Sequence, residues 1–286
     1  MPRKRDPNAA VWAFLRLTRP ADWGLAFAGA VLGARLAGGP PRGTIAFGAA
    51  AVATVIAGTF VNGDWFHRRS RVLANPSNPI ARGLVRPDEA KWLGFVLLAA
   101  GLAAAAFFGF RPFAAALFTA AFVLLINYFF DKSYFARNVL AAAVVAFPVC
   151  YGWLWFAGAA GRAMVAAAVG GLIALAASIF RDVENQRADE LVGRRTIAAG
   201  GGRLPVAVAG AFALAAVAVS VISYRLEEYS RRYLTLVAAV GALVLIYTVL
   251  NLWRREPDPL LAGSTARMMK FLIFVFFAGV YWETLS

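Results

Sequence analysis

The chain has 286 residues, of which 61% are hydrophobic and only 15% charged, and its mean hydropathy is +0.66. A composition this apolar excludes an ordinary soluble domain and is typical of a polytopic membrane protein. The net charge of +14 would suggest nucleic acid in a soluble protein, but the basic residues lie between apolar runs, where they meet lipid head groups and determine topology. We therefore expect an integral, multi-pass membrane protein with no nucleic-acid partner.

The chain begins with a basic segment, MPRKRDPN, followed by a broken apolar stretch. This pattern lacks the compact apolar core and small-residue cleavage site of a signal peptide. We expect residues 1–21 to be a cytoplasmic N-terminal segment of a single domain, residues 1–286. The one cysteine, Cys150, cannot form an intrachain disulfide, and the one histidine, His67, cannot build a histidine metal site.

Nine apolar runs are long enough, at roughly 20 residues, to cross a hydrocarbon core about 30 Å thick. They are rich in Ala, Leu, Val, Gly and Phe without two-residue alternation, which predicts helices and not the strands of a barrel. The expected fold class is therefore an all-α membrane protein, a bundle of nine transmembrane helices. The predicted spans are 22–39, 44–63, 91–109, 112–130, 138–158, 161–180, 204–223, 232–252 and 268–285.

The distribution of Arg and Lys predicts the orientation. With a cytoplasmic N terminus, the cytoplasmic segments carry 22 of the 29 basic residues and the opposite segments carry 7. By the positive-inside rule the N terminus is cytoplasmic and, with nine spans, the C terminus lies outside. We expect a cell inner membrane of the bacterial type, with the functional site facing the cytoplasm.

Two polar stretches interrupt the apolar pattern, one in each half of the chain. The first covers residues 62–83 (NGDWFHRRSRVLANPSNPIARG) and the second residues 182–196 (DVENQRADELVGRRT). Both fall on the predicted cytoplasmic side. The simplest interpretation of either stretch is a solvated interfacial loop, but two of them on one side indicate one site between them, because ionisable residues at a membrane edge are often functional.

The second stretch has the oxygen ligands of a hard metal ion. Asp182, Asn185 or Gln186, and Asp189 lie three to four residues apart, so they share one face if the preceding helix continues. The spacing of Glu184 places it off that face. Carboxylate and amide oxygens are the ligands that Mg²⁺ prefers, with waters and substrate phosphates completing its shell.

The two stretches together resemble the aspartate-rich motifs of the UbiA-type superfamily of intramembrane prenyltransferases. The second stretch is similar to the pattern DxxDxxxD with a GxxT tail, except that Asn185 replaces the middle aspartate. The first stretch matches the tail PxxPIxxG, which aligns Asp64 with the first aspartate of the family's first motif. Other matches are Arg19-Pro20 before the first helix, and Tyr128, Lys132 and Asn138 around the loop after the fourth.

The first motif departs from the family pattern. His67 and Arg71 stand at its second and third aspartate positions, and Asn78 stands where an arginine is usual. Gly63 replaces the motif's asparagine, for which Asn62 is the nearest substitute. Three of the six expected carboxylates remain, namely Asp64, Asp182 and Asp189.

The resemblance covers nearly the whole chain and implies a central cavity open toward the cytoplasmic face. It implies transfer of a prenyl group from a prenyl diphosphate to an aromatic or lipid acceptor, with Mg²⁺ assisting departure of the diphosphate. The implied catalytic residues are Asp64, Asp182 and Asp189, and the same three with Asn185 are the implied metal ligands. The implied diphosphate-binding residues are Asn62, Arg71, Arg82, Lys132 and Arg195.

Several alternatives stay open at this point. Arginines in the first loop can grip a diphosphate directly, so that one metal ion suffices; alternatively, the metal site is broken and the protein is an impaired or repurposed paralog that binds lipid. A terpene cyclase on the same fold would need no acceptor. A small-solute transporter would need paired discontinuous helices, whereas no pair of predicted spans is broken by Gly or Pro, and the only proline in the interior of a span is Pro148, in the fifth.

Overall fold

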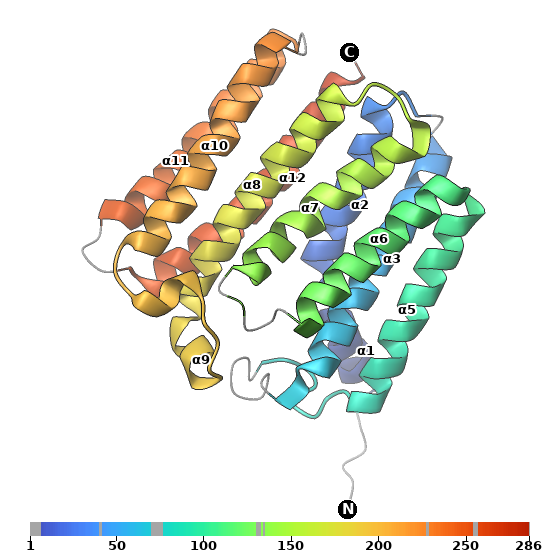
Figure 1. Ribbon diagram of the computed structural model, residues 1–286, viewed down its shortest axis with the longest axis vertical. Helices are drawn as coiled ribbons and strands as arrows, with labels where there is room; N and C mark the ends of the chain where they lie inside the picture. The colour runs from blue at the N-terminus through green and yellow to red at the C-terminus, as the bar shows by residue number, and fades with distance from the viewer. Residues whose placement is uncertain are drawn as a thin grey trace, which may run out of the picture.

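The computed structural model describes residues 7–39, 42–69, 77–129, 133, 135–226, 229–253 and 257–285, and within these ranges the chain is helical without strands. Figure 1 shows the helices running side by side, with α1 at one end of the bundle and the C-terminal end of α12 at the other. The helices are α1 (Pro7–Leu17), α2 (Pro20–Leu36), α3 (Arg42–Phe66), α5 (Pro87–Phe107), α6 (Phe110–Phe129), α7 (Ala136–Phe156), α8 (Gly161–Glu184), α9 (Gln186–Leu191), α10 (Leu204–Leu226), α11 (Arg231–Trp253) and α12 (Pro259–Glu283), with a 3₁₀ turn, η1, at Ile197–Gly200.

The predicted all-α bundle is confirmed. Eight of the described helices are long and apolar enough to cross a membrane. The ninth, α2, has 17 residues and packs against α3, α7 and α12. Its length is about 25 Å, at 1.5 Å per residue, which makes it shorter than each of these eight helices.

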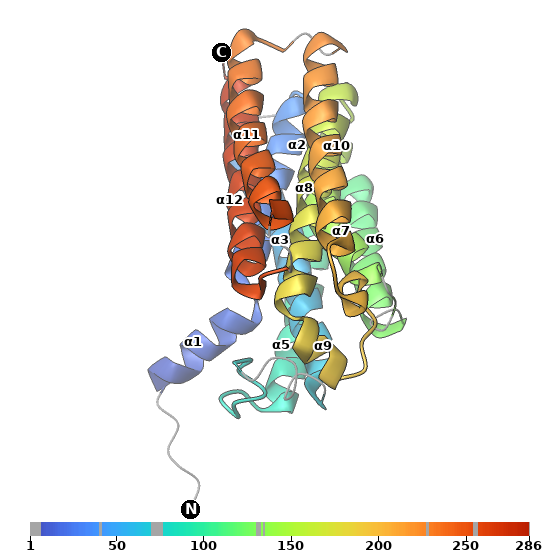
Figure 2. The same ribbon diagram turned by 90° about the vertical axis from the view of Figure 1, so that its left-hand side faces the viewer.

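The N-terminal segment contains a helix that the sequence analysis did not predict. Helix α1 buries Ala13 and Leu17 against Ile80, near the end of the first polar stretch, and Val85, just after it, and leaves Trp12 67% exposed. Figure 2 shows α1 leaving the bundle sideways at the end that also carries α9. Thus α1 covers the loop end of the first half of the bundle.

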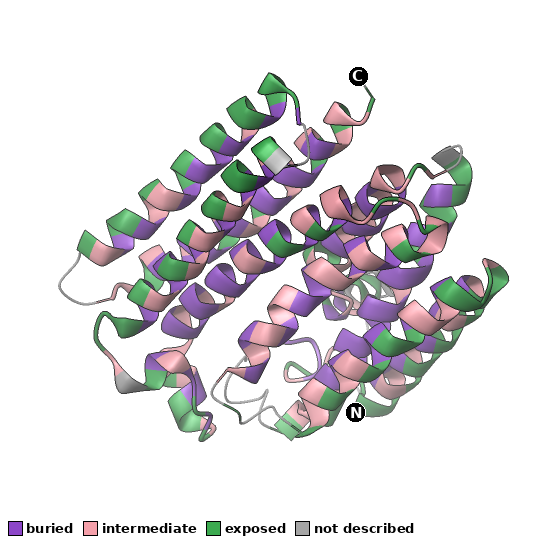
Figure 3. Ribbon diagram, turned by 45° about the horizontal axis from the view of Figure 1, so that its top comes forward, coloured by how far each residue is buried: buried purple, intermediate pink, exposed green. Residues whose placement is uncertain are grey.

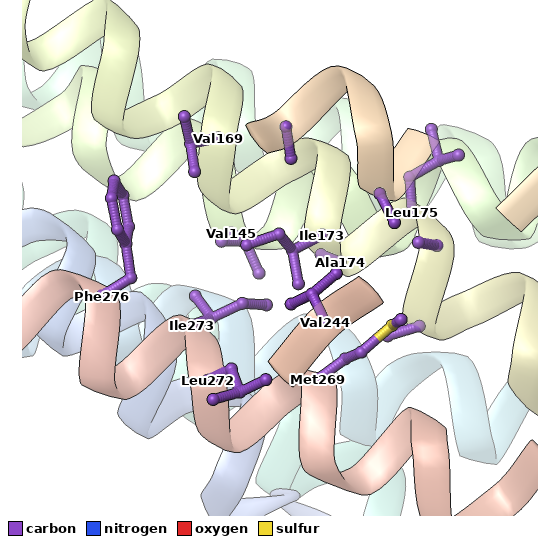
Figure 4. Close-up of a cluster of buried hydrophobic side chains, with 14 of the residues drawn as sticks. Val145, Val169, Ile173, Ala174, Leu175, Val244, Met269, Leu272, Ile273 and Phe276 are labelled. Carbon is purple, nitrogen blue, oxygen red and sulfur yellow. The ribbon is translucent and has the colours of Figure 1, made fainter. Parts of the chain in front are cut away.

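The bundle is apolar both inside and outside. Its largest buried cluster joins α7, α8, α11 and α12 through residues such as Val145, Ile173, Val244 and Ile273 (Figure 4). Figure 3 shows buried residues on the inner faces of the helices and exposed residues on the outer faces. The outer faces still carry large apolar side chains, such as Phe107, 87% exposed, which a lipid environment accommodates.

Small residues bring α2 and α7 into backbone contact. A Cβ atom on Gly33 of α2 would lie 1.9 Å from the carbonyl oxygen of Val149, and one on Gly152 of α7 would lie 2.1 Å from that of Ala30. Distances this short leave no room for a methyl group, so these two glycines set the separation of the helices. The opposite, N-terminal end of α7 carries part of the site described below.

We expect Gly33→Ala to destabilise the protein, because the new methyl group must push the α7 backbone away, at a cost of about 1–3 kcal/mol. The matched control is Gly24→Ala on the same helix, where a Cβ would make an ordinary 3.5 Å contact with Phe274. Thermal unfolding in detergent should show a lower midpoint for Gly33→Ala only. Equal midpoints for the two variants would contradict the close packing of α2 and α7.

Candidate active site

Both polar stretches lie at the same end of the bundle, where α3 and α8 end and where α2, α7 and α12 begin. This follows from the alternating direction of successive helices, which places helix ends far apart in the sequence next to one another (Figure 1). Among the described residues the site contains two groups of side chains. The first group is Asp64, Arg19 and Asn78, and the second group is Asp182, Asp189, Arg137, Asn138 and Arg194.

The first group is centred on Asp64, near the end of α3. This residue is only 3% exposed. Its Oδ1 atom accepts a hydrogen bond from Arg19 Nη2 at 2.8 Å, and its Oδ2 atom accepts one from Asn78 Nδ2 at 2.9 Å. The Arg19 guanidinium also lies over the ring of Phe60, 4.7 Å from its centroid. Both oxygens of Asp64 are therefore bonded within the protein.

Arg19 stands at the junction of α1 and α2 in a left-handed backbone conformation, with φ of 54°. Pro20 follows at the first position of α2, where a missing amide hydrogen costs nothing. Burial alone lowers the pKa of the Arg19 guanidinium, but the nearby carboxylates of Asp64 and Asp22 outweigh that effect and hold the pKa above its ordinary value. Arg19 is therefore a permanent positive charge beside Asp64.

The second group does not lie on one continuous helix, as the spacing had suggested. Helix α8 ends at Glu184, and a separate short helix, α9, begins at Gln186. Asp182 and Asp189 nevertheless converge on one guanidinium, because Arg137 Nη2 lies 3.3 Å from Asp182 Oδ1 and Arg137 Nη1 lies 3.0 Å from Asp189 Oδ1. Asn138 Nδ2 donates to Asp182 Oδ2 at 2.9 Å.

The residues at the break between α8 and α9 have different surroundings. The side-chain amide of Asn185 donates to the carbonyl oxygen of Arg181 at 2.9 Å, which leaves its amide oxygen as the candidate metal ligand. Glu184 turns away toward α12, where it forms an ion pair of 3.2 Å with Arg267. Glu184 therefore does not join Asp182 and Asp189 at Arg137.

Two neighbouring arginines after α9 differ sharply in the exposure of their side chains. Arg194 is 6% exposed, and its Nη1 lies 3.5 Å from Asp189 Oδ1, whereas Arg195 is exposed. Gly193 has φ of 66°, a left-handed conformation that suits glycine and reverses the chain so that Arg194 points inward. The sequence analysis named Arg195 and missed Arg194, because adjacent residues in a turn cannot be assigned to a side without the backbone.

The remaining predicted diphosphate-binding residues are dispersed. Asn62 is fully buried in α3, where Nδ2 donates to Gly58 and the side chain packs against Gly94 of α5. Arg82 is exposed in the turn before α5. Arg71 and Lys132 lie outside the described residues. The roles of these four residues stay predictions, as does the central cavity.

A basic pocket lies where α3 ends. It has a volume of about 320 Å³ and is lined by Phe66, His67, Arg68 and Arg69. The Nε2 atom of His67 donates to the carbonyl oxygen of Asn127 at 2.6 Å, so this nitrogen carries a proton and is not a metal ligand in this arrangement. The positive side chains suit a phosphate group better than a cation.

The sequence analysis missed a half-buried ion pair between α2 and α12. Asp22 accepts a hydrogen bond from Lys270, and the two side chains are 13% and 24% exposed. Each is a charged residue within or next to a predicted apolar span, and a charge in such a place needs a partner. The position of these charges in apolar spans could have indicated that each is paired, but not that Asp22 pairs with Lys270.

We expect Arg194→Gln to destabilise the protein by about 1–3 kcal/mol, because it leaves Asp189 with one fewer buried donor. Arg195→Gln makes the same change at an exposed neighbour and should stay within about 0.5 kcal/mol of the wild type. Thermal unfolding of the two variants side by side measures the difference. A loss of stability in Arg195→Gln alone would mean that the turn is oriented the other way.

The chain is similar in sequence to known archaeal enzymes. The chain is 28% identical to the digeranylgeranylglyceryl phosphate synthase of Thermococcus gammatolerans over 266 residues, which are 92% of this chain and 95% of the relative. It is 29% identical over 239 residues to the synthase of the same name from Halobacterium salinarum, covering 81% of this chain and 84% of the relative.

Solved structures share the fold. A digeranylgeranylglyceryl phosphate synthase superposes with a TM-score of 0.72 at 21% identity, covering 96% of this chain and 99% of that one. A UbiA homologue from Archaeoglobus fulgidus bound to GPP and Mg²⁺ gives a TM-score of 0.68 at 16% identity, covering 96% and 100%. The profile of the UbiA prenyltransferase family matches residues 23–276. The chain therefore belongs to the UbiA prenyltransferase family.

Proposed function

We propose that this prenyltransferase transfers its prenyl group to a lipid acceptor that carries a glyceryl phosphate. Family membership gives the reaction class, and Mg²⁺ is the cofactor of that class. The lipid acceptor is supported by the relatives named digeranylgeranylglyceryl phosphate synthase, which align with 73% to 92% of this chain. The observation that carries the metal-assisted part of the proposal is the convergence of Asp182 and Asp189 on one positive centre.

The second group of side chains fits a magnesium ion. Two buried carboxylates already face a common cation, the guanidinium of Arg137. The Oδ1 atom of Asn138, beside Asp182, is buried and has no hydrogen-bond partner among the described residues. Those residues contain no cluster of three or more acidic, histidine or cysteine side chains. Mg²⁺ suits such a sparse set, because it commonly uses one or two carboxylates and keeps waters and substrate phosphates as its other ligands.

Asp182 and Asp189 would hold the ion, with Asn185 or Asn138 as a neutral oxygen nearby. When bound there, Mg²⁺ supplies charge neutralisation of the leaving diphosphate. The chain's own cations supply the rest of the positive field, since Arg68 and Arg69 line the basic pocket at the end of α3. This arrangement uses fewer carboxylates than the family pattern and more guanidinium groups.

Asp64 has a different part in the proposal. Its two oxygens are bonded to Arg19 and Asn78, so it orients Arg19 at the start of α2. We infer that Asp64 becomes a metal ligand only if one of these bonds opens. This keeps the first half of the site mainly cationic and places the metal ion on the second half.

The site lies at one end of the bundle, which we propose faces the cytoplasm because 22 of 29 basic residues fall on that side. The prenyl chain and the lipid acceptor would then enter from the membrane, while the diphosphate stays at the polar rim. The relatives named above are archaeal, which gives no support to the bacterial-type membrane expected from the sequence.

We expect membranes containing the protein to consume radiolabelled geranylgeranyl diphosphate when Mg²⁺ and geranylgeranylglyceryl phosphate are both present. Asp182→Asn should lower the rate by about 100-fold or more, because the variant loses a charged ligand at the metal. Glu184→Gln is the matched control, since Glu184 is a nearby carboxylate that pairs with Arg267 and should leave the rate within about threefold of the wild type.

The outcomes separate the alternatives. A prenylated glyceryl phosphate lipid that requires Mg²⁺ and Asp182 supports the proposal. A terpene product formed without acceptor would indicate a cyclase instead. Product with an aromatic acceptor alone would reject the lipid acceptor. No consumption of any donor, with the wild type folded, would mean an impaired paralog.

A further inference from the structure

Arg137 occupies the position that a metal ion bridging Asp182 and Asp189 would take. Its Nη1 atom lies 3.0 Å and 3.3 Å from the two oxygens of Asp189, and its Nη2 atom lies 3.3 Å from Asp182 Oδ1. The remaining oxygen, Asp182 Oδ2, accepts a hydrogen bond from Asn138. Every carboxylate oxygen of the second group therefore has a donor from the protein.

Among the described residues, the ion-paired side chains of this group balance one another's charge without a metal. Two carboxylates face two guanidinium groups, those of Arg137 and Arg194. Buried carboxylates normally need such compensation, because removing a charge from water is costly. A divalent ion added to this balanced group would create an excess of positive charge in a poorly solvated place.

Arg137 and a bridging metal cannot bind the two aspartates at the same time. A Mg²⁺ ion held by both aspartates would lie about 2.1 Å from its oxygen ligands, in the space between the carboxylates that the guanidinium now fills. Two cations held this close repel each other strongly where water screens them poorly. Metal binding at Asp182 and Asp189 therefore requires Arg137 to move.

Arg137 can leave without unfolding the site. Its side chain is 26% exposed, whereas those of Asp182 and Asp189 are 1% and 4% exposed, so the guanidinium lies on the outer side of the carboxylates. It is the second residue of α7, next to Asn138, whose side chain stays fixed by Ser178 and Asp182. The long arginine arm is thus attached to an anchored helix end.

We propose that Arg137 is a resident counter-cation that competes with Mg²⁺ for Asp182 and Asp189. In the absence of substrate the guanidinium stays bound to Asp182 and Asp189, which lowers the affinity of these two carboxylates for a metal ion. An arriving diphosphate offers the displaced guanidinium a new anionic partner, so substrate and metal strengthen each other's binding. This coupling rests on the proposed function, whereas the competition itself requires only the geometry described above.

The test measures binding of Mn²⁺, a probe for the magnesium site, to the purified full-length protein in detergent without any prenyl donor. Electron paramagnetic resonance gives the free ion concentration and hence the affinity. Arg137→Gln should bind Mn²⁺ about tenfold or more tightly than the wild type, because a competing charge has been removed. Arg187→Gln is the matched control, since Arg187 is exposed on α9 and its loss changes net charge equally; it should stay within about twofold of the wild type.

Arg137→Lys provides a second variant if Arg137→Gln does not give folded protein. Lysine keeps the charge but lacks the planar fork that spans two carboxylates, so its Mn²⁺ affinity should lie between those of the wild type and Arg137→Gln. Arg137→Gln binding no more tightly than Arg187→Gln would overturn the proposal, as would Arg137→Lys equal to or weaker than the wild type. Because no donor is present, an inactive enzyme would not affect the result.

Discussion

The pairing of buried carboxylates with guanidinium and ammonium groups is the constraint on which the loop end of this bundle depends. Asp64 with Arg19, Asp182 and Asp189 with Arg137, and Asp22 with Lys270 each join helices that are distant in sequence. A carboxylate without a partner would be destabilising in these places. Each pair therefore compensates the charge of its carboxylate and holds the ends of two helices together. The apolar helices determine the bundle, and these pairs determine how its polar end is assembled.

The same pairs give the site its chemical character. The family pattern anticipates six carboxylates, whereas this chain keeps three and surrounds them with arginines. Arg19 takes the place beside Asp64 that a metal would otherwise need, and Arg137 does so beside Asp182 and Asp189. Our proposal of one metal ion and a diphosphate bound largely by side-chain cations rests on these pairs.

The sequence predicted the bundle well because a membrane span needs a long apolar run, which is a local property. The predicted span 138–158, for example, corresponds to α7 at Ala136–Phe156. The motif spacing also singled out the candidate carboxylates Asp64, Asp182 and Asp189. It could not identify their partners, since Arg137 lies 45 residues from Asp182, and Lys270 lies 248 residues from Asp22. The helix α1 and the break after Glu184 were missed because neither has a strong local signal.

A structure of the protein with Mn²⁺ and a thiolodiphosphate analogue of the prenyl donor, with the ion located by anomalous scattering, tests the central claim most directly. Our account predicts one ion about 2.1 Å from oxygens of Asp182 and Asp189, with the Arg137 guanidinium displaced toward the diphosphate and Asp64 still bonded to Arg19. An ion bound elsewhere while Arg137 still bridges the two aspartates would contradict it.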